Sequence, residues 1–372
     1  MSKSLRQVTR FASESVCAGH PDKVADQISD AILDAVLKQD PDGRTAIETL
    51  VGHDHIVLAG EINTSAKIDV EKIVRDQIRR LGYVEPRWGF SHKSPITNYL
   101  HQQSGEISVG VDDFGAGDQG LMFGYACKET PELMPTPIVL AHGLTRALDE
   151  ARESERLPHL RPDGKAQVVV RYEDGKPAAV EHVTIAIPHA EKVSLERIRR
   201  DVYDAIITPV LKRYGYSVQA RNVVVNGTGV WHMPGPSSDA GLTGRKIVVD
   251  GYGGYARVGG GAFSGKDPSK VDRSGAYAAR YIAKNIVGNG LADKAEVALA
   301  YYIGAKEPVN FTINTFGTGK KSQIAIDSYA RKLLTPSVKE IVEKLDLRRP
   351  IYLPTAAYGH FGRGDVPWEK VV

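Results

Sequence analysis

Apolar residues recur in several stretches of the chain at the three-, four- and seven-residue spacing of a helix that buries one face. The first stretch runs from Pro21 to Asp40, and Pro21 suits the first helical position because its missing N–H would have no partner there. The same spacing predicts helices at about 70–82, 136–152, 195–214, 272–287 and 329–345. Gly82 and Gly288 suit the ends of two of these helices, where glycine is favoured.

Shorter runs of β-branched and aromatic residues predict strands at 45–50, 55–62, 166–172, 180–187, 222–225, 247–250, 295–302 and 309–315. Residues 173–176, Glu-Asp-Gly-Lys, form a hairpin turn signal between two of them. Strand pairs mixed with single helices predict an α+β fold with mainly antiparallel sheets. The polar, glycine-rich stretch 102–120 has no helical period and predicts a surface loop or a domain connection.

The composition excludes several classes of protein. The 372 residues suffice for two to three domains, and 42% hydrophobic with 25% charged residues is ordinary for a globular chain. Lys and Arg number 48 against 45 Asp and Glu, and this net +3 argues against a nucleic-acid or anionic-membrane partner. Cys17 and Cys127 are too few for a disulfide scaffold or a four-thiolate zinc site. Without an apolar run of membrane-spanning length or a signal-peptide core, we expect a soluble cytoplasmic protein.

Two short motifs resemble nucleotide-binding loops, but their contexts differ. Residues 115–120 match G-x-G-x-x-G, yet no helix is expected to begin there, as a dinucleotide-binding fold requires. Residues 260–266 match G-x-x-x-x-G-K, but Asp267 stands where a P-loop has Ser or Thr, and Pro268 disfavours a helix at that point. Glycines with a lysine remain suited to an anion, because backbone N–H groups can approach it closely.

A second candidate anion site lies at the start of the first predicted helix. With Pro21 in the first helical position, His20 becomes the N-cap, and Asp22 and Lys23 fall in the first turn. His20 and Lys23 could donate to a phosphate at this helix N-terminus, and Asp22 could hold a magnesium ion. The alternative is a plain capped helix start, where an acidic residue is favoured by the helix dipole.

The segment 245–273 strengthens the interpretation as a phosphate site. It holds six basic residues (Arg245, Lys246, Arg257, Lys266, Lys270, Arg273) and three acidic ones (Asp250, Asp267, Asp272), a net +3 among seven glycines. Lysines for phosphate and carboxylates for magnesium are the composition of a polyphosphate site. The alternative for any one of these residues is a solvated surface charge. No Ser-His-Asp set, HExxH or Cys/His metal spacing occurs, so positioning and electrostatics without a covalent intermediate are the expected chemistry.

Several strings together resemble one family over nearly the whole chain, the S-adenosylmethionine synthases (methionine adenosyltransferases). They are SESV at 13–16, GHPDK at 19–23 with ADQISD at 25–30, GEI at 60–62, GAGDQGLMFGYA at 115–126, LRPD at 160–163, GLTGRK at 241–246, GGGAFSGKDPSKVDR at 259–273 and AAYGHFG at 356–362. The resemblance implies that ATP, L-methionine and water give S-adenosylmethionine, phosphate and diphosphate. In the implied reaction the methionine sulfur attacks C5′ of ATP, and the released triphosphate is then hydrolysed.

The resemblance also implies a fold of three similar α+β domains with approximate threefold symmetry, at 8–107, 118–233 and 234–370. Their sheets are expected to be mainly antiparallel or mixed and to be covered by helices. Family members form homodimers whose active sites take residues from both subunits, and two dimers often form a homotetramer. No nucleic acid or membrane partner is implied.

Matched position by position, the resemblance implies catalytic roles for His20, Lys165, Arg245, Lys266 and Lys270, with His20 at the departing C5′ oxygen. ATP contacts are implied for His20, Lys23, Asp163, Lys165, Trp231, Asp239, Arg245, Lys246, Ala262 and Lys266. Methionine contacts are implied for Glu61, Gln103, Asp118, Asp239 and Lys270. Two Mg²⁺ per site are implied, with Asp22 and Asp272 as ligands, and one K⁺ with Glu48. For Asp118 alone, closing a tight turn is an equally good reading.

The chain departs from the family pattern at two places. The usual Pro-Thr-Gly-Arg-Phe reads GTGVW at 227–231, so Trp231 can stack on adenine but Val230 cannot supply the arginine charge. The loop from Gln103 to Gly115 is shorter than the bacterial pattern and has Gly105 in place of a proline. The resemblance implies that this loop is a gate over the site, and the differences suggest that it opens and closes faster or more loosely here. Two other functions stay open: a kinase or ligase with a magnesium–triphosphate site, and a nucleotide-binding protein without catalysis.

Overall fold

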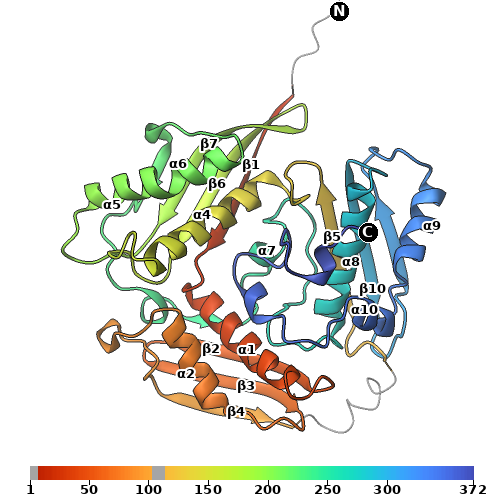
Figure 1. Ribbon diagram of the computed structural model, residues 1–372, viewed down its shortest axis with the longest axis horizontal. Coiled ribbons are helices and arrows are strands. Elements are labelled where there is room, and N and C mark those ends of the chain that lie inside the picture. Colours follow the sequence, from red (N-terminus) through yellow and green to blue (C-terminus); the bar gives the residue numbers. More distant parts are fainter. Residues whose placement is uncertain (1–6, 103–113) are drawn as a thin grey trace, which may run out of the picture.

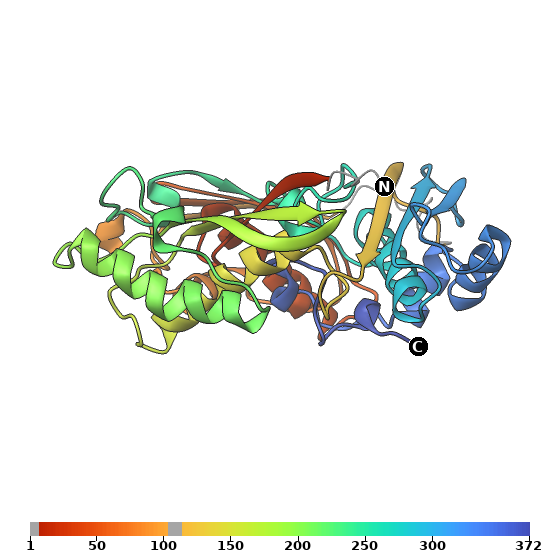
Figure 2. The same cartoon turned by 90° about the horizontal axis from the view of Figure 1, so that it is seen from above.

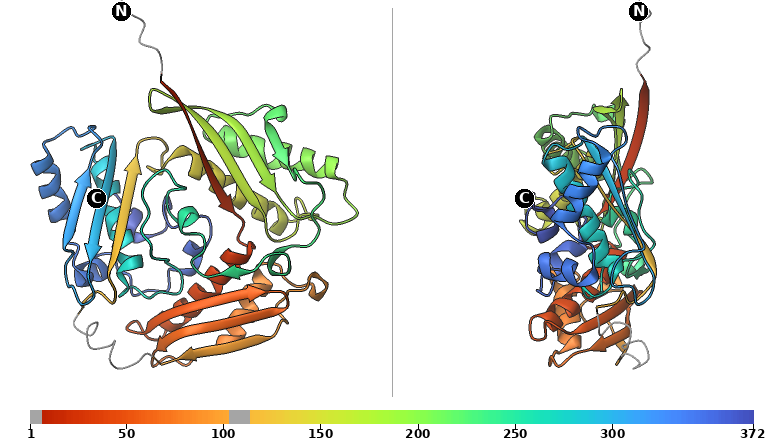
Figure 3. Two further views of the ribbon diagram at one scale, coloured as in Figure 1. Left: turned by 180° about the vertical axis from the view of Figure 1, so that it is seen from behind. Right: turned by 90° about the vertical axis from the view of Figure 1, so that its right-hand side faces the viewer.

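Three β-sheets surround the centre of the molecule, and helices pack against one side of the sheets (Figure 1). The computed structural model describes residues 7–102 and 114–372. Seen from above the molecule is flat (Figure 2), and the edge-on view places the strands toward one face and the helices toward the other (Figure 3). Within these residues no helix is long and apolar enough to span a bilayer.

The first sheet has the strand order β4-β3-β2-β9. It consists of β2 (Arg44–Gly52), β3 (His55–Asn63), β4 (Ile96–His101) and β9 (Gly241–Leu242), with helices α1 (Pro21–Leu37) and α2 (Val70–Arg80). In β2 the residues from Thr45 to Val51 are alternately buried and accessible, because successive side chains point to opposite faces. Glu48 and Leu50 therefore lie on the open face of this sheet.

The second sheet has the order β1-β6-β7-β8. It consists of β1 (Val8–Val16), β6 (Lys165–Glu173), β7 (Lys176–Ala186) and β8 (Val223–Val225), with helices α4 (Thr136–Glu153), α5 (Leu195–Val202) and α6 (Thr208–Arg213). The helix predicted at 195–214 is interrupted by a π turn at Tyr203–Ile207, immediately before α6 and its Pro209. Proline lacks the N–H that a continuous α-helix would use, so the wider turn accommodates it.

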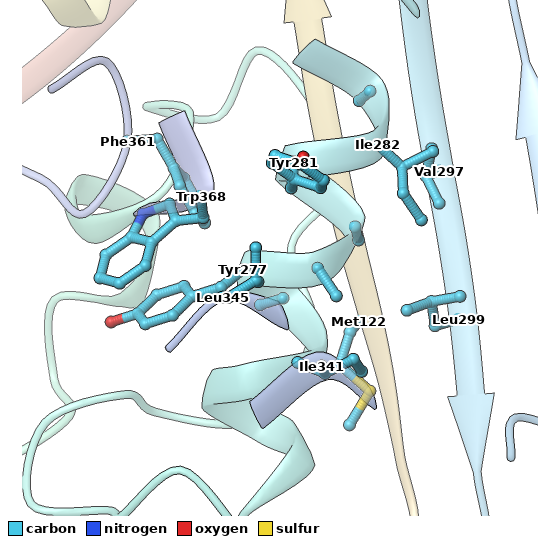
Figure 4. Packing of buried hydrophobic residues seen from close by; sticks show 14 of the residues in the cluster. Met122, Tyr277, Tyr281, Ile282, Val297, Leu299, Ile341, Leu345, Phe361 and Trp368 are labelled. Atoms are coloured by element: carbon cyan, nitrogen blue, oxygen red, sulfur yellow. The ribbon is translucent and has the colours of Figure 1, made fainter. Parts of the chain in front are cut away.

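The third sheet has the order β11-β10-β5. It consists of β5 (Gly120–Cys127), β10 (Lys294–Tyr301) and β11 (Asn310–Asn314), with helices α7 (Ile247–Asp250), α8 (Val271–Gly288), α9 (Gln323–Leu333) and α10 (Val338–Lys344). Figure 4 shows its core, where α8 lies between the strands β5 and β10 and the C-terminal segment. Tyr277 of α8 stacks on Trp368 with ring centroids 3.7 Å apart.

The three sheets share one topology. Each contains the order helix, hairpin, helix: α1-β2-β3-α2, α4-β6-β7-α5 and α8-β10-β11-α9. In the first two a further strand, β4 or β8, then pairs in parallel with the second hairpin strand, whereas the other pairings are antiparallel. The predicted α+β fold with three similar parts and approximate threefold symmetry is confirmed.

The repeats also exchange their outer strands in a cycle. Strand β1 leads into α1 but pairs with β6; β5 leads into α4 but pairs with β10; and β9 precedes α7 and α8 but pairs with β2. Each sheet is therefore completed by a strand from a different third of the chain, and the three repeats are joined by backbone hydrogen bonds as well as by packing.

The strand predicted at 247–250 is wrong, because these residues form the short helix α7. Four apolar or acidic residues are too few for periodicity to separate strand from helix. The single helix predicted at 329–345 is also wrong: α9 ends at Leu333, and Leu334 is extended ahead of the helix α10. Pro336 explains this break, because the residue before a proline is disfavoured in a helix. Strands β1, β4, β5 and β9 were not predicted.

Four aspartates of α1 connect this helix to the second half of the chain. Asp22, Asp26, Asp30 and Asp34, the aspartate row, are four residues apart and so share one side of the helix. They accept backbone N–H bonds from Leu242 (3.0 Å), Gly244 (2.8 Å), Gly265 (2.9 Å) and Leu353 (2.8 Å), in that order. The row therefore fixes three separate C-terminal segments to one helix.

Asp34 is the member of the row from which we expect a pH signature. Burial raises its pKa from 3.8 to about 6, although the N–H groups of Leu353 and Tyr352 oppose this. Between these two values the folded state holds a proton that the unfolded state has lost, so the stability contributed by Asp34 falls as the pH rises from about 4 to about 6. Asp34→Asn cannot lose a proton, so wild-type stability relative to this variant should fall by about 1–3 kcal/mol between pH 4 and pH 7. Urea unfolding of both proteins measures this difference, and a difference independent of pH would contradict the shift.

Candidate active site

The first part of the site is the N-terminus of α1. His20 is the N-cap, is buried, and its Nδ1 accepts the N–H of Asp22 at 3.2 Å. Since Nδ1 is the acceptor, the proton of a neutral ring lies on Nε2, which can donate to an oxygen atom. Burial lowers the pKa of His20 to about 3, with further lowering by Lys246 and Lys165. His20 is therefore a neutral donor close to two lysines.

Asp22, in the first turn of α1, lies beside two basic side chains of the segment 241–246. Lys246 Nζ donates to Asp22 Oδ2, and Arg245 Nε lies 3.8 Å from Asp22 Oδ1. Burial alone would raise the pKa of Asp22, but the hydrogen bonds from Lys246 and the Leu242 N–H hold it below its usual value. Gly241 is required here, because a Cβ at this position would lie 2.1 Å from the Pro21 carbonyl oxygen.

The second part of the site is the glycine-rich turn before α8. Lys266 Nζ donates to Asp272 Oδ2 at 2.5 Å, and Lys270 Nζ donates to the buried Asp267. Asp272 lies against Gly261, where an added Cβ would be 2.1 Å from the Asp272 carboxyl carbon. The two parts meet at Ala262, since a Cβ on Gly244 would be 2.5 Å from the Ala262 Cβ.

The open face of the first sheet contributes two glutamates. Ala46 of β2 pairs with Glu61 of β3 on one side and with Lys266 on the other, so these three residues form one row across the sheet. Glu48 lies two residues further along the same face. Burial raises the pKa of Glu48, and the charge of Lys266 opposes this effect. The carboxylates expected for potassium and methionine are thus near the lysine expected for phosphate.

The remaining expected residues come from the second third of the chain. Lys165 begins β6 and pairs with Val16, five residues before Pro21. Asp163 is buried against Gly19, where an added Cβ would be 2.6 Å from the Asp163 nitrogen. Its Oδ2 accepts the Gly235 N–H at 2.9 Å. Burial raises the pKa of Asp163 to about 7, so this carboxyl group is poised to bind a proton near neutral pH.

Three further expected residues lie near the surface. Trp231 is half-buried and donates from Nε1 to the Met233 carbonyl oxygen at 2.7 Å, and Asp239 is exposed. Asp118 is also exposed, and its Oδ1 accepts the Gln119 N–H at 2.7 Å, as in a local turn. Gln103 and residues 104–113 of the loop expected to gate the site lie outside the described residues.

Magnesium fits this donor set as an ion that arrives with phosphate. Among the described residues no group of three or more His, Cys, Asp or Glu side chains could hold a metal ion. In nucleotide sites Mg²⁺ takes one or two carboxylates and completes its shell with phosphate oxygens and water. Asp22 and Asp272 each present a carboxylate oxygen to a lysine, and so could exchange this partner for a cation.

Family models match nearly the whole chain. Models described as S-adenosylmethionine synthetase match residues 8–105 as the N-terminal domain, 113–231 as the central domain and 233–370 as the C-terminal domain. The chain belongs to the S-adenosylmethionine synthetase family. The resemblance based on sequence motifs is confirmed.

Curated relatives agree with this assignment. The S-adenosylmethionine synthase of Sulfurovum sp. (strain NBC37-1) is 51% identical over 368 residues, covering 97% of this chain and 95% of the relative. That of Wolinella succinogenes is 51% identical over 373 residues, covering 98% and 96%. The enzyme of Clostridium tetani is 49% identical over 378 residues, covering 97% and 96%.

Lys23, which was expected to contact ATP, and Arg273 of the glycine-rich segment are both buried. Lys23 is buried, and its Nζ donates to Asp26 at 2.7 Å and to Asp250 at 2.6 Å. These two carboxylates keep the Lys23 pKa raised despite the opposing effect of burial. Arg273, counted among the basic residues of the glycine-rich segment, is fully buried against Asp30. The ammonium group of Lys23 thus serves the core rather than an open phosphate site.

Sequence reasoning missed the residues that support the site. The aspartate row and Asp267 bind backbone and cations beneath the glycine-rich segments. No role was predicted for Asp26 or Asp30, and Asp267 was counted among carboxylates suited to magnesium rather than as a support. A signal was present, since acidic residues at four-residue spacing beside buried apolar positions would require partners. The partners themselves lie more than 200 positions away and could not be identified from spacing.

The neutral state of His20 can be tested by NMR. Histidine labelled at Cε1 should give a His20 signal, assigned with His20→Asn, that does not titrate between pH 5 and pH 8, because its pKa is about 3. Lys246→Met should move this pKa upward by removing the nearby positive charge. Lys320→Met, at an exposed ion pair with Asp293, serves as the control and should leave it unchanged. A His20 midpoint near the ordinary 6.5 would contradict the buried neutral state.

Proposed function

We propose that this chain is an S-adenosylmethionine synthase that converts ATP, L-methionine and water into S-adenosylmethionine, phosphate and diphosphate. The observation that carries the proposal is the meeting of a neutral histidine at a helix N-terminus with Lys165 and Lys246 from two separate segments. The glycine-rich turn that carries Lys266 adjoins the same site at Ala262. The names of the relatives, at 49–51% identity over nearly their full lengths, support the same activity. Both cysteines are free thiols, which suits a reducing cytoplasm.

In the proposed reaction the methionine sulfur attacks C5′ of ATP and expels the triphosphate, which is then hydrolysed to phosphate and diphosphate. Negative charge gathers on the departing oxygen, so fixed donors at that position lower the barrier. His20 would donate from Nε2 to this oxygen, while Arg245, Lys246, Lys165 and Lys266 would bind phosphates. Two Mg²⁺ held with Asp22 and Asp272 would neutralise phosphate charge, and K⁺ would bind at Glu48.

The two substrates are proposed to lie where the two parts of the site meet, at Ala262. Trp231 would stack on the adenine, Asp163 and Ala262 would contact ATP, and Asp239 would lie between nucleoside and methionine. Glu61, Lys270, Gln103 and Asp118 would bind methionine. Lys270 would have to leave Asp267, to which it is bound in the present structure. Alignment of sulfur, C5′ and oxygen requires these contacts to act together.

The decisive assay for this function resolves the products of ATP, methionine, Mg²⁺ and K⁺ by mass. S-adenosylmethionine with phosphate and diphosphate supports the proposal; ADP or AMP would instead indicate a kinase or ligase, and no turnover at any pH or salt concentration a binding protein. Lys266→Ala should lower the rate by at least about a hundredfold, because one strong donor to the leaving group is lost. Lys320→Ala removes an exposed lysine at a surface ion pair and is the control. A Lys266→Ala rate within a few-fold of wild type would exclude Lys266 from the mechanism.

We further propose that two chains pair through their open sheet faces, so that each active site is shared, and that two such dimers form a tetramer. Apolar residues on the sheets support this pairing: Leu50 of β2 is 43% exposed, Tyr99 of β4 64% and Leu121 of β5 56%. Several expected site residues (Glu48, Asp118, Lys165, Asp239, Arg245) are also exposed in the single chain. A second copy would cover both sets of residues.

Charge placed on the sheet face should prevent this pairing. Leu50→Glu should reduce the mass measured by light scattering to that of one 40.5 kDa chain and should abolish activity. Ile324→Glu is the matched control, because Ile324 is 82% exposed on α9 and lies outside the sheet faces. A dimeric or tetrameric Leu50→Glu protein would contradict the proposed interface, whereas a monomeric wild type with full activity would contradict shared sites.

A further inference from the structure

The turn that carries Lys266 is held from beneath by one buried ion pair. Arg273 is fully buried on α8 and binds Asp30 of the aspartate row through two hydrogen bonds, 2.7 Å from Nη1 and 2.8 Å from Nη2. Two parallel bonds fix the orientation of both groups, which a lysine could not reproduce. The plane of this guanidinium is also held by the Tyr352 ring, whose centroid is 4.2 Å from Arg273 Cζ.

The same pair makes three hydrogen bonds to the backbone of the turn at residues 263–266. Arg273 Nη1 also donates to the carbonyl oxygens of Phe263 at 3.0 Å and Lys266 at 3.2 Å. Asp30 Oδ1 accepts the N–H of Gly265, which lies between them, at 2.9 Å. Three backbone positions, 263, 265 and 266, are thus tied to two side chains that are themselves bonded to each other.

Other contacts also hold this turn: the Phe263 ring packs against Tyr277, His360 and Phe361. The Gly265 carbonyl oxygen accepts the Ile47 N–H at 3.1 Å. Gly265 has φ +82°, a left-handed conformation that favours glycine, and a Cβ there would be 2.0 Å from the Ile47 carbonyl oxygen. Gly265 itself has no side chain to bury, so its position depends on backbone hydrogen bonds, among them the N–H that Asp30 accepts. Arg273 also directly follows Asp272, whose carboxylate binds Lys266 Nζ at 2.5 Å.

We propose that the Arg273–Asp30 pair is a positioning element of the active site, which sets the place of Lys266 and Asp272 without touching substrate. The proposal rests on the proposed function, because positioning has meaning only if Lys266 acts on phosphate. A displacement of about 1 Å in a catalytic group costs about a hundredfold in rate. Loss of the pair should therefore lower kcat much more than it changes the KM for methionine.

The chain provides a matched control on the same helix. Arg280 is also fully buried, binds Glu369 through two hydrogen bonds of 2.8 and 2.9 Å, and donates to the carbonyl oxygens of Tyr125, Leu133 and Glu132. It differs from Arg273 in holding β5 and the C-terminal segment rather than the turn at 263–266. A purely structural role predicts equal effects of the two substitutions.

The experiment compares Arg273→Lys, Asp30→Asn and Arg280→Lys in the full-length protein. At matched folded fractions, the first two should lower kcat by about a hundredfold with a KM for methionine within about threefold, whereas Arg280→Lys should keep kcat within about threefold. Independently of activity, amide hydrogen exchange over 262–268 should accelerate in the first two variants and not in the third. Asp30→Asn keeps the size of the side chain and tests the pair if Arg273→Lys does not fold.

Several outcomes would overturn the proposal. Equal losses of kcat in Arg273→Lys and Arg280→Lys would assign both pairs to stability alone, as would failure of both variants of the pair to fold while Arg280→Lys folds. Unchanged exchange over 262–268 would show that the pair does not hold the turn. Lack of S-adenosylmethionine formation by the wild type would instead reject the proposed function, and the exchange result would then stand by itself.

Discussion

The contact on which the rest of the structure depends is the row of carboxylates on α1 that bind distant backbone N–H groups. Apart from Leu242 and Phe263, the glycine-rich segments 241–246 and 259–265 have no large apolar side chains to bury, so hydrogen bonds carry much of their positioning. Carboxylates within hydrogen-bond distance can accept these bonds, but a buried charge is costly unless a cation and several donors surround it. Lys23 is the cation for Asp26 and Arg273 is the cation for Asp30 in the interior. Lys246 is the cation for Asp22 nearer the surface. The position of the glycine-rich segments of the site is therefore set by one helix, α1.

The same contacts explain how so many charges coexist in a nearly neutral protein. In the structure each candidate magnesium carboxylate is already paired with a candidate phosphate lysine: Asp22 with Lys246 and Asp272 with Lys266. Binding a magnesium–triphosphate complex would exchange these partners, with the cation going to the carboxylate and the anion to the lysine. The net charge of the pocket need not change, and little reorganisation would be required. A preorganised arrangement of this kind is where electrostatic stabilisation is most effective.

Sequence patterns predicted the long elements well, because an apolar face such as that of α1 has a period that local residues determine. They failed where context decides: 247–250 is a helix, Pro336 divides the last predicted helix, and β9 is too short to have a pattern. For the site, motif identity singled out His20, Asp22 and Lys246, which the structure brings together. The buried roles of Lys23 and Arg273 could not be predicted, since a basic residue in a glycine-rich segment looks the same whether its partner is a phosphate or a buried aspartate.

The cyclic exchange of outer strands has a consequence for synthesis on the ribosome. Strand β1 remains unpaired until β6 is complete at Glu173, and the edge of β2 waits for β9 at residues 241–242. These pairings have large sequence separation, so the chain has a high contact order and must hold exposed strand edges while it is being made. No third of the nascent chain can close its own sheet, and the protein becomes topologically complete only when the last third has emerged.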